Sequence, residues 1–511
     1  MARPPDQLTT LPTELLTGVL ELLDASTLIA CMLICRRLKI LIDNTASLKY
    51  ILALNASGME DGRNSTLSLI ERGRRLDAYH SAWQTLTWSD ERVVAFPGHA
   101  IVRMSGGFLV AIEPHFVHIW QIPSQLRGVE AQPLRRLAFP SNNVLAISIE
   151  PEEDLLVILC ASERFVLRSA FSGMPHPKAH IFDIDFDTMH PDVLGNLVCG
   201  FCIRQSWADA TIYNWYTGRE MVLFWALDLC LLDGGYILTF EHDIDGGIVL
   251  MVYGSSAWNT GSDVKPNDHV VALLLPKFWD SVASCDFSVD AFPGGTRGTP
   301  QSGHFFSTHA VRLLSATVDF HPSTPTEEEE TEARAHIPKL EFTFPSTVIM
   351  DYISLARESS DGADTNPGYH PIPWDEWAPG NVLVTPVTVG FSSRTSFLET
   401  GCDCRAMQLI RPSLIKIYDF HPWRVRRASK AGTRTETITG RIEREWLLSD
   451  VRSGDPFIDT FLKCTITDYT PSFKVDNTVS LMLAEDALIV IPKDTEIEGG
   501  KAVRKVHIFS I

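Results

Sequence analysis

Most of this 511-residue chain has the sequence pattern of β-strands. From about Thr85 onward, short apolar runs alternate with turn residues, and no long helical pattern interrupts them. A strand-only stretch as long as 85–511 must cover its exposed strand edges, and a ring of small sheets is the solution that scales to this length. We therefore predict an all-β propeller of about seven blades over 85–511, with a pair of β-sandwiches or a solenoid as alternatives.

The apolar runs and the segments between them predict where strands, turns and loops lie. The early strands are expected at 92–96, 107–112, 116–122, 144–149, 155–160 and 165–171. Hairpin turns are expected at Asp233-Gly234-Gly235 and Asp245-Gly246-Gly247. Long polar insertions, which we expect to form loops, lie at 254–268, 293–303, 321–338, 358–380 and 424–437.

Faint repeats and the C-terminal end of the chain support a ring. Similar apolar strings at 117–120, 165–168 and 211–215 recur about 46 residues apart, which is the length of a four-stranded blade. The chain ends on another apolar run, VHIFSI. We expect this run to pair with 92–96 and close the ring, so removal of the last six residues should open it.

The N-terminal segment 8–52 has helical spacing instead. Thr10 or Thr13 is expected to cap a first helix with Pro12 and Glu14 in its first turn, and Asp24 precedes a second helix over 27–35. A third short helix is expected through Ile42. The apolar face is too broad for a unit this small to bury alone, so an external partner is expected.

These residues resemble the F-box family. Its LP, acidic, hydrophobic and VCR-type positions are matched by Leu11-Pro12, Glu14, Leu15, Val19, Leu20, Leu23-Asp24, Leu28 and Ile34-Cys35-Arg36-Arg37. The family commonly has Trp where this chain has Leu38. The resemblance implies docking on the Skp-type adaptor of a cullin-based ubiquitin ligase, with adaptor contacts among Leu11, Pro12, Leu15, Leu16, Val19, Leu20, Leu23, Leu28 and Cys35. An ordinary helical hairpin packed on its own domain is the alternative.

Residues 53–84 are expected to be a helical linker. A loop is expected at 55–63, followed by a helix capped by Asn64 that buries a stripe of Leu69, Leu76 and Trp83. The string ERGRRLDAYHSAWQTLTW resembles the junction of fungal F-box proteins, and the string YNWYTG at 213–218 resembles the end of a WD-type repeat. The resemblance thus implies a fungal F-box protein with a degenerate, WD-like propeller.

The composition excludes some classes of partner and location. Acidic residues number 63 and basic residues 44, and the formal charge of −19 opposes binding to nucleic acid or anionic membranes. No apolar run approaches the length of a membrane span, so a cytoplasmic or nuclear location is expected. The ten Cys lie mostly in apolar segments and are interpreted as reduced, buried thiols.

No motif assigns catalysis, a metal or a cofactor. Phosphate-binding glycine loops, GxSxG and HExxH are absent from the sequence, so we do not expect an enzyme. His115 and His118 should face opposite sides of a strand, which disfavours shared metal ligation. The pairs Cys199/Cys202 and Cys402/Cys404 have ligand-like spacing, but the first lies in a buried strand pattern and the second in an expected exposed turn.

Two short charged motifs remain. The acidic run 326–332 is either a solvated loop or a docking site for a basic partner. The string Arg426-Arg427-Ala428-Ser429 has the spacing that basophilic kinases recognise, which makes Ser429 a candidate phosphosite. The alternative for this second motif is an exposed basic loop.

Two functional hypotheses follow. In the first, the F-box-like helices bind the adaptor, and the propeller holds an unidentified protein target for ubiquitin transfer by other subunits. In the second, the chain is a β-propeller scaffold or enzyme that acts outside a ubiquitin ligase, and its N-terminal helices simply pack on the ring.

Overall fold

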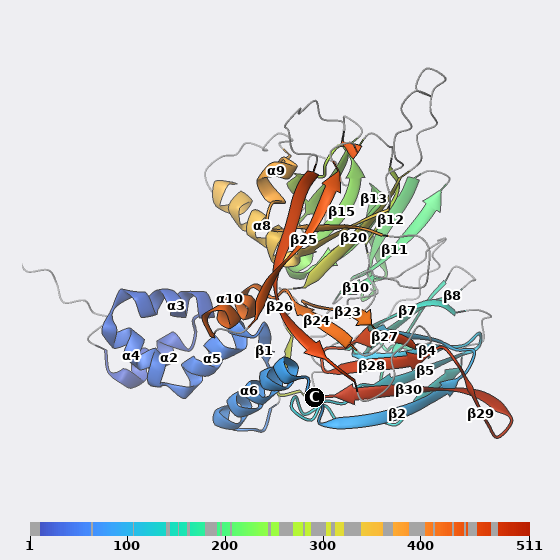
Figure 1. Cartoon of the computed structure of the whole chain (residues 1–511), viewed down its shortest axis with the longest axis horizontal. Coiled ribbons are helices and arrows are strands. Elements are labelled where there is room, and N and C mark those ends of the chain that lie inside the picture. Colours follow the sequence, from blue (N-terminus) through green and yellow to red (C-terminus); the bar gives the residue numbers. More distant parts are fainter. Residues whose placement is uncertain are drawn as a thin grey trace, which may run out of the picture.

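The computed structural model places a small helical unit beside a ring of β-sheets (Figure 1). The described residues are 11–511 with gaps at 63–64, 106, 139–143, 152, 161–163, 179–191, 195–196, 205–206, 244–246, 255–268, 279–281, 288–302, 308–311, 321–338, 361–370, 388–403, 412–413, 432–433, 444–445, 448–456 and 472–478. Every structural statement below concerns these residues.

The helical unit contains four helices, one more than predicted. They are α2 (Thr13–Leu20), α3 (Ala25–Ile34), α4 (Arg36–Asn44) and α5 (Ala46–Ala56). The short strand β1 (Met59–Asp61) and the long helix α6 (Leu69–Thr85) follow. The loop expected at 55–63 is therefore wrong, because α5 continues to Ala56 and β1 pairs with another strand.

The rest of the described chain forms seven antiparallel sheets that follow one another along the sequence. The closing sheet joins β2 (Asp90–Pro97) to β30 (Lys501–Ser510), β28 (Ala487–Pro492) and β27 (Val479–Leu483), and β29 (Glu496–Glu498) pairs with β30. The next sheet contains β3 (Ile101–Ser105), β4 (Phe108–Ile112), β5 (Phe116–Gln121) and β6 (Arg135–Ala138). The third contains β7 (Val144–Glu150), β8 (Leu155–Cys160) and β9 (Arg164–Ser169).

Four more sheets complete the set. The fourth contains β10 (Asp192–Leu194), β11 (Leu197–Arg204), β12 (Trp207–Asn214) and β13 (Arg219–Ala226). The fifth contains β14 (Asp228–Leu232), β15 (Tyr236–His242), β16 (Ile248–Tyr253) and β17 (His269–Leu274). The sixth contains β18 (Val282–Phe287), β20 (Leu313–Phe320), β21 (Leu340–Pro345) and β22 (Leu383–Pro386). The seventh contains β23 (Arg405–Arg411), β24 (Leu414–Asp419), β26 (Phe457–Tyr469) and β25 (Thr435–Glu443).

The hydrophobic cores show that these sheets close into a ring. Each pair of successive sheets shares one buried cluster, from the closing and second sheets through to the sixth and seventh. A seventh cluster joins the last sheet to the closing sheet through residues such as Ile417 and Leu488. Because every sheet buries both faces against its two neighbours, no face is left for water, and the arrangement is a seven-bladed β-propeller. The predicted fold is confirmed.

Ring closure uses the strands expected from the sequence. β2 pairs antiparallel with β30 in a register that places Val94 opposite Val506 and Arg92 opposite Ile508. β30 also pairs with β28, so the C-terminal strand lies inside the closing sheet. The six early strands are found as expected to within a few residues. Asp233-Gly234-Gly235 forms the turn between β14 and β15, whereas Asp245-Gly246 lies outside the described residues.

Helices occupy parts of two of the predicted loops. α8 (Ser346–Ser360) enters the segment 358–380, and α9 (Trp374–Trp377) lies inside it. α10 (Pro422–Ala431) and the start of β25 occupy 424–437. The loop assignment was wrong because these polar-looking segments bury a few apolar side chains against the ring, such as Trp374 and Trp377. Most of 254–268, 293–303 and all of 321–338, including the acidic run, lie outside the described residues.

Candidate functional site

Of the first two helices of the helical unit, only the second has an N-cap side chain that accepts a hydrogen bond. Pro12 occupies the N-cap of α2, so the predicted cap by Thr13 is wrong, and Thr10 lies outside the described residues. Asp24 caps α3 and accepts a hydrogen bond from the Thr27 amide at 2.7 Å and one from the Ser26 hydroxyl at 2.6 Å. These hydrogen bonds lower the pKa of Asp24. The second helix therefore starts two residues earlier than expected.

The helical unit has a small core of its own. Its buried residues are Leu16, Leu20, Leu28, Leu38, Ile42 and Leu48. Three of the predicted adaptor-binding residues, Leu16, Leu20 and Leu28, thus contact other residues of the unit. Leu38, at the position where the family commonly has Trp, is only 1% exposed and also packs inside this core.

The outer surface of the same unit is unusually apolar. Leu15 and Val19 are exposed on α2, and Leu22 follows this helix with 86% of its surface exposed. On α3, Leu33 is 83% exposed and Ile34 67% exposed. Isolated apolar side chains at a surface are ordinary, whereas several large ones on a unit this small favour a role in binding a partner. We call Leu15, Val19, Leu22, Leu33 and Ile34 the apolar surface.

The structure divides the nine predicted adaptor-binding residues into three groups. Pro12, Leu15 and Val19 are exposed, and Leu11, Leu23 and Cys35 are partly buried. Leu16, Leu20 and Leu28 are buried. Leu22, Leu33 and Ile34 were missed, because a continuous apolar sequence does not show which side of a helix faces its neighbours. Leu22 and Leu33 have no assigned place in the family pattern quoted above.

The strand β1 connects the helical unit to the ring. It pairs antiparallel with β19 (Phe305–Ser307), with Met59 opposite Ser307. The Tyr50 hydroxyl on α5 donates a hydrogen bond to Asp61 at 2.8 Å, and Arg72 forms an ion pair with the same carboxylate. Since Asp61 belongs to β1, these contacts tie α5 and α6 to the strand pair.

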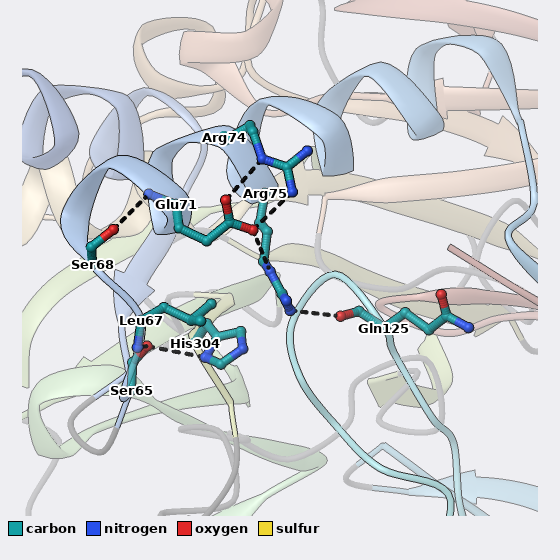
Figure 2. A network of polar contacts seen from close by, with 8 residues as sticks. All are labelled: Ser65, Leu67, Ser68, Glu71, Arg74, Arg75, Gln125 and His304. Atoms are coloured by element: carbon teal, nitrogen blue, oxygen red, sulfur yellow. Dashed lines mark hydrogen bonds and ion pairs between the residues drawn. The ribbon is translucent and has the colours of Figure 1, made fainter.

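Polar contacts position the start of α6 (Figure 2). Ser68, and not the predicted Asn64, caps this helix by accepting a hydrogen bond from the Glu71 amide at 3.3 Å. Glu71 in turn bonds to Arg74 and Arg75, which lower its pKa to about 2. Arg75 also donates to the Gln125 carbonyl at 3.1 Å, in the connection between β5 and β6. The N-terminal half of α6 is thereby fixed to the second sheet.

The other half of α6 enters the cluster where the ring closes. Leu76, Tyr79 and Trp83 are buried there, whereas Leu69 of the predicted stripe is partly exposed. The Tyr79 hydroxyl donates to the Glu485 carbonyl at 2.6 Å, in the turn between β27 and β28. The guanidinium carbon of Arg405 on β23 lies 4.4 Å from the Trp83 ring centroid. One helix thus contacts both the last sheet and the closing sheet.

A buried ion cluster lies beside this helix. The Arg127 side chain contacts Glu485 at 2.9 Å and donates from Nε to Asp486 at 2.6 Å. Burial, together with the adjacent Glu485 carboxylate, raises the pKa of Asp486 to about 6, although Arg127 opposes this shift. The cluster joins the β5–β6 connection to the β27–β28 turn, so it links the second sheet to the closing sheet.

α10 provides a second attachment. Arg424 donates to the Ser57 carbonyl at the end of α5 at 3.1 Å and forms an ion pair with Asp419 of β24 at 2.8 Å. Gly58 packs so closely on His421 that an added Cβ would lie 2.3 Å from Nε2 of its ring. The φ of Gly58 is +64°, a backbone conformation that also favours glycine. Figure 1 shows α5 and α10 on the side of the helical unit that faces the sheets, so this side is attached to the ring.

The histidines and cysteines with ligand-like spacing have structural contacts. Glu113 hydrogen-bonds to His118 and, at 3.0 Å, to His99, while His115 is not part of this set. Within the described ranges no group of three potential ligands is placed to hold a metal ion. Cys199 and Cys404 are buried, which corrects the exposed turn expected at Cys404, and Cys402 lies outside the described residues. No described helix is long and apolar enough to cross a membrane.

Comparison with known proteins identifies the class of the helical unit. Residues 8–52 match the family described as F-box-like. The chain therefore combines an F-box-like domain with a β-propeller. No curated protein matches the chain.

Solved structures similar to this chain have low sequence identity and include a WD40 domain and a β-propeller domain. The WD40 domain of coronin from Toxoplasma gondii is 8% identical, with 83% of this chain and 88% of that chain covered and a TM-score of 0.35. The β-propeller domain of Cps50 (Swd1) from Myceliophteria thermophila is 10% identical, with 83% and 100% covered and a TM-score of 0.37. Hsv2 from Kluyveromyces lactis is 11% identical, with 73% and 86% covered and a TM-score of 0.32. Sequence identities and TM-scores this low carry no argument about function. The ring itself is established by the order of the sheets and by the hydrophobic clusters that neighbouring sheets share.

Proposed function

We propose that this protein is a non-catalytic substrate receptor of a cullin-based ubiquitin ligase. In this proposal the F-box-like unit binds a Skp-type adaptor, the adaptor connects the chain to a cullin, and the propeller binds the target protein. The single observation that carries the proposal is the apolar surface on a unit that matches the F-box-like family. A β-propeller scaffold outside a ubiquitin ligase is the second candidate.

The energetics support an external partner for the apolar surface. Fully burying one Leu, Ile or Val side chain contributes about 1.5–3 kcal/mol. Leu22 and Leu33, each more than four-fifths exposed, leave most of that free energy unused in the isolated chain. A groove that accepts them would bury this area without any change in the small core beneath it. Of the adaptor contacts predicted from the sequence, we therefore keep the three exposed residues, Pro12, Leu15 and Val19. To these we add Leu22, Leu33 and Ile34.

The attachments described above support a receptor role as well. β1, α6 and α10 hold the helical unit against the ring at separate points. A target bound by the propeller would then lie at a fixed position relative to the adaptor. We also propose a relationship to fungal F-box proteins, from the resemblance of the junction string, and a cytoplasmic or nuclear location.

The test is recovery of a purified Skp-type adaptor by the full-length chain. Leu15→Asp combined with Leu33→Asp should reduce recovery at least tenfold, because two charges would be forced into an apolar groove. Ile70→Asp is the matched control, since Ile70 is 77% exposed on α6 and outside the unit. Circular dichroism should match the wild type for both variants. Full adaptor recovery by the double variant would refute the proposed surface, and no recovery by the wild type would favour the scaffold.

A further inference from the structure

The helix α10 has one buried face and one exposed face. Val425 and Ala428 are buried in the helix, and His421 is buried immediately before it. A second stripe, at a spacing of three residues, consists of Trp423, Arg426 and Ser429, all of them exposed. The exposed basic loop considered for this motif is therefore an ordered helix, and Ser429 lies in its last turn on the same face as Arg426.

The sequence around Ser429 is unique in this chain. An Arg-Arg pair occurs four times, at residues 36, 74, 135 and 426, and only the last pair is followed two places later by a hydroxyl residue. We propose that Ser429 is a phosphoacceptor for arginine-directed Ser/Thr kinases and that the Arg426 side chain holds the resulting phosphate. This site does not depend on adaptor binding.

The attachments of α10 allow its last turn to unwind while its first turn stays in place. Arg424, in the first turn, is bound to Asp419 and to the Ser57 carbonyl. Ser429 is two residues from the helix end at Ala431. Helix ends open locally at little cost compared with global unfolding, so the serine can reach an extended conformation without loss of the anchored turn.

Arg426 is placed to bind a phosphate at Ser429. Side chains three residues apart on a helix are neighbours, so the guanidinium can reach the phosphate oxygens with charge-assisted hydrogen bonds. In the unmodified chain the guanidinium carbon of Arg426 lies 5.2 Å from the Trp423 ring centroid, and both side chains are exposed. The partial negative charge at a helix C-terminus opposes a phosphate there, and the contact with Arg426 supplies the compensating attraction.

The reaction is an ordinary phosphoryl transfer from ATP. The Ser429 Oγ forms a bond to the γ-phosphorus, and the bond between that phosphorus and the oxygen bridging to the β-phosphate breaks. ADP leaves, and the hydroxyl proton passes to the base of the kinase. The modified serine then carries about −1.5 to −2 charges at neutral pH.

Treatment of the folded full-length chain with an arginine-directed Ser/Thr kinase and ATP tests the proposed phosphoacceptor at Ser429. We expect mass spectrometry to locate phosphate at Ser429, and Ser429→Ala to lower total incorporation at least tenfold. Ser354→Ala is the matched control, because Ser354 is exposed on α8 without an arginine pair before it, and it should leave incorporation unchanged. An unmodified Ser429 in the folded chain, under conditions that fully modify the free peptide 422–433, would overturn the proposal.

A second measurement tests the role of Arg426 independently of any kinase. Phosphoserine is introduced at 429 during translation, and the second ionisation of the phosphate is followed by phosphorus NMR. We expect its pKa to lie below the ordinary value of about 6 and to return to that value in Arg426→Gln. The same pKa with and without Arg426 would refute the proposed contact.

Discussion

Removal of residues 506–511 is expected to open the propeller. Residues 506–510 form the second half of β30, which lies between β2 and β28 in the closing sheet, and Ile511 follows this strand. Their loss leaves β2 without the strand opposite Asp90–Val94 and leaves β28 without its partner at Ala487–Val490. The two ends of the ring would then no longer be joined by backbone hydrogen bonds in this segment.

The expected loss of stability is comparable to the stability of a whole domain. Val506, Ile508 and Ile511 are fully buried, and Phe509 is 4% exposed. Burial of four such side chains contributes about 6–12 kcal/mol, estimated from transfer free energies. Folded domains are stable by only about 5–15 kcal/mol, so the shortened chain should not keep a closed ring.

The assay compares the chain ending at Lys505 with the full-length chain. We expect the shortened chain to be aggregated or to unfold without a cooperative urea transition. Ile508→Ala and Ile497→Ala form a graded pair, because Ile508 is fully buried on β30 and Ile497 is 80% exposed on β29. Ile508→Ala should lower the free energy of unfolding by about 2–5 kcal/mol, and Ile497→Ala should leave it almost unchanged. A soluble, monomeric shortened chain with an unchanged unfolding midpoint would refute the closure argument.

Two further predictions concern α6 and the ion cluster beside it. Leu76→Ala should destabilise the propeller by about 2–5 kcal/mol in urea unfolding, whereas Ile70→Ala on the exposed face should not, and equal effects would show that α6 is not part of the ring-closing core. Because the folded pKa of Asp486 is above its ordinary value, its protonated form stabilises the fold, and this contribution is lost as pH rises from about 4 to about 6. The stability of Asp486→Asn relative to wild type should therefore increase over that pH range, and a constant difference would contradict the assignment.

The sequence alone determined the strands of the propeller, the pairing that closes the ring and the presence of the helical unit. Apolar runs separated by turn residues identified the strands, because a strand that is buried on both faces needs continuous apolar sequence. The pairing of 92–96 with the C-terminal run followed from the need to cover strand edges, and the register of β2 on β30 confirms it. The helical unit was also evident, since its spacing and its match to the F-box pattern are both local features.

Only the tertiary structure decided which apolar residues of the helical unit face outward. Leu20 and Leu22 are equally apolar, yet Leu20 is 2% exposed and Leu22 86% exposed, because the direction of each side chain depends on how four helices pack. The same reason explains why Leu38 lies in the core. α9 has only four residues, which is too short to show a period. α8 and α10 were missed although Val348, Ile349 and Ile353 in α8, and Val425 and Ala428 in α10, recur at helical spacing, because the surrounding sequence has the pattern of strands and polar loops.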